Sequence, residues 1–65
     1  MKLTYNEETE RYNAFSCGDQ FKIKANDKWA IVRIELNSKG WYLIDEYGFI
    51  SYCKNLEGSE IEELY

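Results

Sequence analysis

Polar and apolar residues alternate over short stretches of this chain, and the alternation predicts β-strands. Between positions 20 and 25 every second residue is apolar, which predicts a half-buried strand with Phe21, Ile23 and Ala25 on its buried face. The longest apolar stretch, positions 29–36, is rich in β-branched residues, which favours a strand over a helix. Its core face is expected to consist of alternate residues, namely Ala30, Val32, Ile34 and Leu36.

Polar residues and glycines separate the predicted strands. A polar turn over 6–10 divides two apolar pieces, 3–5 and 12–15, and this pattern predicts an opening hairpin. Further breaks, each rich in turn-forming residues, are predicted at 16–19, 26–27, 37–40 and 47–48. Strands are therefore also expected over 41–46 and over 49–53, the second of which ends at Cys53.

The segment after Gly58 has two interpretations. Ser59 and Glu62 have the spacing of a capping box, which would begin a short helix over 60–65. Alternatively the segment is a closing strand in which Ile61 packs against other apolar residues. A small sheet needs its edges covered, and this requirement favours the strand.

These elements predict an all-β fold, a small SH3-like barrel of five or six short antiparallel strands. The 65 residues leave room for one domain, 1–65, and 45% of them are hydrophobic, including eleven aromatic residues. Apolar residues occur on both faces of the strands predicted over 41–53, and we take this as typical of a closed or nearly closed barrel.

The charge distribution is uneven along the chain. The net charge is −4, but residues 20–42 contain five basic and two acidic residues, and both flanking segments are acidic. Pairing of opposite charges across neighbouring strands would explain this pattern. The overall negative charge disfavours nucleic acid or an anionic membrane as the partner, because phosphate binding needs clustered Lys and Arg.

Several classes of chemistry are not expected of this sequence. It contains no His, which removes the commonest general base and metal ligand. The two cysteines, Cys17 and Cys53, do not have metal-ligand spacing, although one disulfide between them stays an open alternative. The four glycines are isolated at turns, and adjacent carboxylates on a strand point to opposite faces. We therefore expect no catalysis, no cofactor and no metal.

The cellular location is predicted from two kinds of segment that the sequence lacks. The N-terminal residues have no apolar segment typical of a signal peptide, and no apolar run has the length of a membrane span. A cytoplasmic protein that does not bind membranes is the expectation.

One group of residues has the composition of a binding surface. If the two strands around Asn26 and Asp27 pair as a hairpin, one of its sides combines cations with apolar groups. The residues are Lys22, Lys24, Trp29, Ile31 and Arg33. Such a side could bind a peptide with Trp29 as the anchor, or stack on the bases of a single strand while its cations contact phosphates. In a purely structural interpretation, Trp29 covers a strand end and the lysines keep the face soluble.

Four short motifs resemble a known family. They are CGDQFKI from Cys17, NDKW from Asn26, RIE from Arg33 and GWYLI from Gly40. In this order they resemble a family of very short bacterial proteins classified as a domain of unknown function. The resemblance implies a small cytoplasmic protein, often from plasmids, phages or integrated elements, with no known activity or cofactor to transfer. It also implies a Leu-Gly pair and a more basic closing strand after Asn55, where this chain is acidic.

The sequence thus predicts a protein-interaction or accessory module whose partner is another protein. The alternative is a nucleic-acid-binding accessory factor that uses the basic and aromatic face. A further alternative is an acidic DNA mimic that binds a basic protein. Exposed edges of a small sheet also make a homodimer an expectation.

Overall fold

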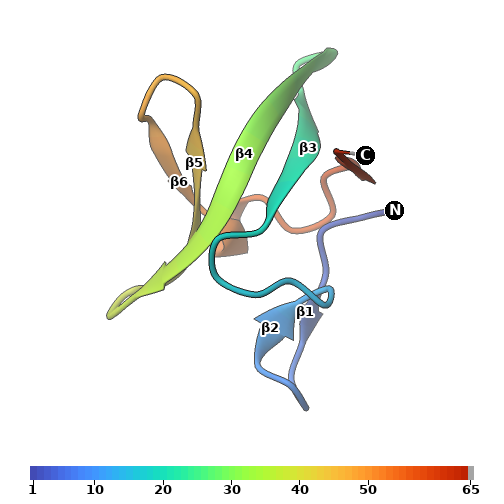
Figure 1. The fold of residues 1–65 in the computed structure, drawn as a ribbon. Coiled ribbons are helices and arrows are strands. Elements are labelled where there is room, and N and C mark those ends of the chain that lie inside the picture. The colour runs from blue at the N-terminus through green and yellow to red at the C-terminus, as the bar shows by residue number, and fades with distance from the viewer. Residues whose placement is uncertain (65) are drawn as a thin grey trace.

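The computed structural model describes residues 1–64, which form seven strands and one short 3-10 helix (Figure 1). In chain order these elements are β1 (Tyr5–Asn6), β2 (Arg11–Tyr12), β3 (Gln20–Ala25), β4 (Lys28–Asn37), β5 (Gly40–Asp45), β6 (Ile50–Tyr52), the 3-10 helix η1 (Cys53–Asn55) and β7 (Ile61–Glu63). The fold is all-β, as the alternation predicts.

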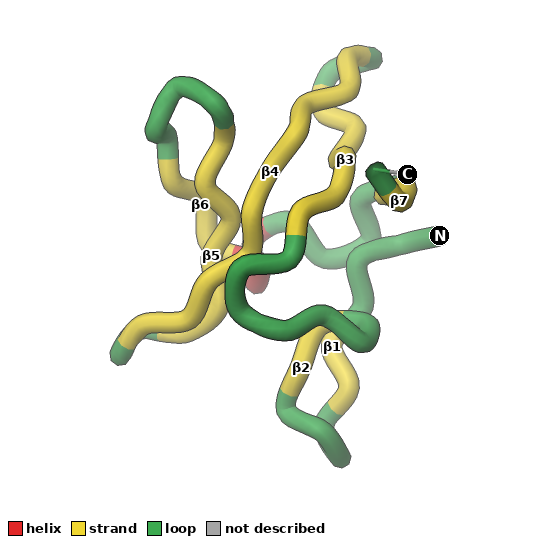
Figure 2. The backbone as a smooth tube through the Cα atoms, viewed as in Figure 1, coloured by secondary structure: helices red, strands yellow, loops and turns green. Residues whose placement is uncertain are grey.

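Five strands form one antiparallel sheet in the order β6-β5-β4-β3-β7 (Figure 2). The short β1–β2 hairpin is separate from this sheet and lies at one end of the molecule. The opening hairpin predicted from the sequence is therefore present, but its strands are only two residues each.

The turn between β3 and β4 sets the register of the longest strand pair. Both turn residues have a positive φ, 52° at Asn26 and 65° at Asp27, which suits the tight two-residue turns that follow the twist of a hairpin. The resulting register pairs Lys24 with Trp29 and Lys22 with Ile31.

The C-terminal segment is a strand. β7 pairs with β3, so that Ile23 lies opposite Ile61, and the capping-box helix does not form over the described residues. The first residues of the chain run beside this segment: the Ile61 amide donates to the Met1 carbonyl (2.8 Å) and the Leu3 amide donates to the Ser59 carbonyl (2.9 Å). The last predicted residue of the segment, Tyr65, lies outside the described residues.

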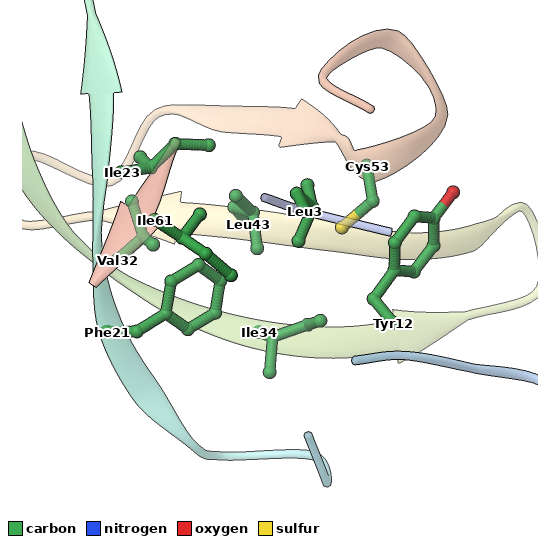
Figure 3. Close-up of a cluster of buried hydrophobic side chains, with 9 residues drawn as sticks. All are labelled: Leu3, Tyr12, Phe21, Ile23, Val32, Ile34, Leu43, Cys53 and Ile61. Carbon is green, nitrogen blue, oxygen red and sulfur yellow. The ribbon is translucent and has the colours of Figure 1, made fainter. Parts of the chain in front are cut away.

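The core lies against one face of the sheet and draws on nearly every element (Figure 3). Phe21 is fully buried, and the ring of Phe15 stacks on it with 4.2 Å between the ring centroids. The nine buried apolar residues are Leu3, Tyr12, Phe21, Ile23, Val32, Ile34, Leu43, Cys53 and Ile61.

Three details of the prediction were wrong. Ala25 and Leu36 have the alternation of core residues but are exposed, Leu36 to 51%, because each lies near a hairpin end that projects beyond the core. The strand predicted over 49–53 covers only Ile50–Tyr52, and Phe49 precedes it. Cys53 does not end a strand but begins η1, whose turn directs the thiol into the core.

Candidate interaction face

The sheet has a second face, opposite the core, which we call the outer face. On β3 and β4 the buried residues Phe21, Ile23, Val32 and Ile34 point to the core, so their neighbours along each strand lie on the outer face. The structure brings together on this side the five residues singled out from the sequence, Lys22, Lys24, Trp29, Ile31 and Arg33. Trp29 is 42% exposed.

The outer face extends further than the sequence argument indicated. Ile44 on β5 lies opposite Arg33, and Ile50 on β6 lies opposite Ile44, so both isoleucines continue the face away from β3. One step along the sheet, Glu35, Tyr42 and Tyr52 form a second row. We call the apolar residues of these rows, Ile31, Ile44, Ile50, Tyr42 and Tyr52, the outer apolar stripe.

The two tyrosines of the stripe hold each other in place. Their rings meet edge to face with centroids 6.0 Å apart, and the Asn37 side-chain amide donates to the Tyr52 hydroxyl (3.2 Å). Alternation over 41–46 already separates Tyr42 and Ile44 from the buried Leu43. The sequence does not show the register, which places Ile44 opposite Arg33 and Tyr42 opposite Glu35.

A hollow of about 380 Å³ lies in the middle of the outer face. Ile31, Arg33 and Ile44 line it together with Gln20 and Glu46, and the loop after β5 borders it. Two of the five predicted residues, Ile31 and Arg33, therefore contribute to a concave surface between β4 and β5.

An acidic residue lies next to each of three cations of the outer face, Arg33, Lys22 and Lys24, and that of Arg33 forms an ion pair. Arg33 Nε is 2.8 Å from Glu35 Oε2, and both side chains stay partly exposed. Glu62 of β7 lies directly opposite Lys22. The Lys24 amide donates to the Glu60 carbonyl (2.9 Å), which brings Glu60 beside it. The register thus places opposite charges across neighbouring strands at Lys22 and Glu62, whereas the ion pair of Arg33 with Glu35 lies within β4.

The thiols and the buried phenol lie away from this face. Both cysteines are free: Cys17 is exposed in the turn before β3 and Cys53 is buried. Burial, together with the charge of Glu57, raises the pKa of the Cys53 thiol to about 11, so the thiol stays protonated at neutral pH and is a poor nucleophile. The Tyr12 hydroxyl donates to Glu57 Oε2 (2.7 Å), and burial followed by this hydrogen bond raises the pKa of Tyr12.

Within residues 1–64 no three His, Cys, Asp or Glu side chains gather as metal ligands would. Nor does any helix in the range have the length and apolar character needed to cross a membrane.

The fold and its outer face define a small antiparallel β-sheet protein with a partly exposed apolar stripe across three strands. The chain belongs to the family described as Domain of unknown function (DUF5348), which matches residues 1–62. The resemblance carried by the motifs between Cys17 and Ile44 is thus confirmed, and the match extends over the opening hairpin and into the acidic β7. Neither the curated proteins nor the solved structures contain a match to the chain.

Proposed function

We propose that this protein is a small interaction module, without catalysis of its own, that binds another protein on its outer face. The observation that carries the proposal is the outer apolar stripe, which crosses three strands, with Ile50 53% exposed and the other four residues partly exposed. Sheet faces exposed to water normally carry polar residues in alternation with the core residues. A face that keeps Ile31, Ile44 and Ile50 instead is suited to burial against a partner.

The order of the elements supports an SH3-like barrel as the framework of this module. Strands β3, β4, β5 and β6 form a meander, the 3-10 helix η1 follows, and the last strand returns to pair with the first strand of the meander. β4 is the longest strand, with ten residues; its first part pairs with β3 and its last part pairs with β5. In such a barrel the outer face points away from the enclosed core, where a partner can reach it.

The charges of the face indicate the chemistry of the partner. Lys22 and Lys24 border the stripe on the β3 side, and Glu46 borders its central hollow on the other side. A protein surface with apolar groups at its centre and charges of both signs around them complements this pattern. Single-stranded nucleic acid is less well matched, because Arg33 is already paired with Glu35.

Replacing Trp29 and Arg33 together by Ala tests the proposed face. Trp and Arg are the residue types that most often dominate binding energy, so we expect the double variant to recover a specific partner at least about 30-fold less efficiently than the wild type. The experiment is a quantitative pull-down from the native host. Circular dichroism would establish that the variant is folded.

The matched control replaces an apolar residue and a cation elsewhere, Leu36→Ala with Lys39→Ala, at the tip of the β4–β5 hairpin. This variant should recover the partner as well as the wild type does. Equal recovery by all three proteins would refute the outer face as the binding surface. In parallel, titration of labelled single-stranded DNA at low and moderate salt should show no binding, and binding that weakens steeply with salt would favour the nucleic-acid alternative.

A further inference from the structure

Among residues 1–64, the most exposed aromatic side chains lie in the loop between β5 and β6, away from the centre of the outer face. Tyr47 is 83% exposed and Phe49 is 73% exposed. The loop nevertheless has a well-defined conformation centred on Asp45. The Oδ1 atom of Asp45 accepts hydrogen bonds from the amides of Tyr47 (2.8 Å) and Phe49 (3.0 Å). The Asp45 amide in turn donates to the Phe49 carbonyl (3.1 Å).

These hydrogen bonds hold an apolar projection in water before any partner is bound. Because its backbone is already ordered, burying the Phe49 ring would cost less conformational entropy than burying a ring on a mobile loop. Gly48, with a φ of 87°, provides the bend that the loop requires.

An apolar hollow lies directly beside this projection, on the core side of the sheet. It has a volume of about 380 Å³ and opens between the β3–β4 turn and the β5–β6 loop, which lie at the same end of the molecule (Figure 1). Its apolar lining includes Ala30, Val32, Leu43 and Leu56, and Ala25 and Phe49 border it. The volume is within the range of about 300–1,000 Å³ found for small-molecule pockets, so a phenyl ring can enter it.

We infer that two copies of this chain associate through this end of the molecule, with Phe49 of each copy inserted into the hollow of the other. An interface about a two-fold axis uses the same patch on both subunits, and this patch contains a projection together with a hollow that can receive it.

The size of the molecule is compatible with such a dimer. A standard interface buries about 800 Å² on each partner, which is roughly a sixth of the 4781 Å² surface of this chain. The dimer interface adjoins the outer face, because Val32 and Asp45 border both hollows, but Phe49 borders only the core-side hollow and Arg33 only the outer one. Variants at Phe49 and at Arg33 therefore test the dimer and the proposed protein partner separately.

Sedimentation equilibrium of the purified chain between about 1 μM and about 300 μM tests the inference. We expect the wild type to dimerise within this range. Phe49→Ser should weaken the dimer at least about 30-fold, because it removes the inserted ring from both subunits. Leu36→Ser, which replaces an equally apolar exposed residue at another hairpin end, should leave the dimerisation constant unchanged.

A second variant tests the hollow without altering the projection. Ala25→Trp, at an exposed position on its border, should fill the hollow and weaken the dimer while Phe49 stays in place. A chain that is monomeric at every concentration would overturn the inference and leave the hollow to a different partner. A dimer that survives both Phe49→Ser and Ala25→Trp, or one that is lost in the Trp29→Ala, Arg33→Ala variant instead, would also overturn it.

Discussion

At the scale of single residues, one hydrogen bond links the opening hairpin to the segment after η1. The hydroxyl of Tyr12, on β2, donates to Glu57, and the buried Cys53 lies in the same part of the core. Burial disfavours the charged forms of both the phenol and the thiol, and the negative charge of Glu57 acts in the same direction. The folded protein therefore holds two protons more tightly than the unfolded chain does.

This difference predicts loss of stability at alkaline pH. In the unfolded chain a thiol loses its proton near about pH 8.5, whereas in the folded protein the pKa of Cys53 is about 11. Between these values the unfolded state binds fewer protons, so the free energy of unfolding falls as the pH rises. We expect Cys53 to account for a loss of about 2–3 kcal/mol by the upper end of this range, measured by urea unfolding at a series of pH values.

The raised pKa of Tyr12 adds to the fall at the alkaline end, and single variants separate the two groups. Cys53→Ala should show a smaller decrease between about pH 8.5 and pH 11 than the wild type does, whatever its stability at neutral pH. Tyr12→Phe should remove the remaining part of the decrease above the ordinary pKa of a phenol, about 10. If Cys53→Ala and the wild type lose stability in parallel, the thiol is not responsible.

At the scale of elements, the β3–β4 hairpin determines which residues share the outer face. Its two-residue turn requires a positive φ at both positions, and Asn and Asp adopt this conformation more readily than most residues. A turn one residue longer would change the register, and it would move one set of side chains to the other side of the sheet. The association of Lys22 with Ile31 thus depends on Asn26 and Asp27.

Substitutions at Asp27 test this requirement. Asp27→Val places a β-branched residue at a φ of 65° and should lower the free energy of unfolding by about 1–2 kcal/mol. Asp27→Gly removes the steric penalty, and the protein should be at least as stable as the wild type. Urea unfolding measures both effects. Ser38→Val, in the β4–β5 turn at a residue without positive φ, is the control, and a loss there as large as that of Asp27→Val would contradict the explanation.

At the scale of the whole molecule, the two ends of the chain complete the core together. β7 covers the free edge of β3, and the first residues of the chain run along β7. The backbones of Lys2 and Glu60 pair there in an isolated antiparallel β-bridge. Leu3 and Ile61 are both fully buried although each lies within five residues of a chain end. Truncating either side chain should lower the stability of so small a domain substantially, because few other side chains bury comparable apolar area.

Ile61→Ala measures the contribution of this closure. Removing most of a fully buried side chain should lower the free energy of unfolding by about 2–5 kcal/mol, a large share of the stability of a small domain. Glu63→Ala, on the same strand but exposed, should change it by less than about 0.5 kcal/mol. The measurement is again urea unfolding, and equal stability of the two variants would show that β7 is not part of the cooperative unit.

The sequence by itself determined the local elements of this protein. Period-two alternation predicted β3 with its bounds, and turn-forming residues located every hairpin of the main sheet. Both depend on the nearest neighbours along the chain, through steric limits on φ and through the opposite orientation of successive side chains. The same alternation identified five residues of β3 and β4 that lie on the outer face.

Only the tertiary structure decided which strands are neighbours and how far burial extends. The pairing of β7 with β3 joins segments about forty residues apart, and it is favoured by burial of Ile61 rather than by any local preference. The outer apolar stripe depends on the register of three strands, so Tyr42 and Ile50 could not be assigned to it from spacing alone. Leu36 and Phe49 are exposed because the hairpin ends project beyond the core, and the limits of a core are a property of the packed molecule.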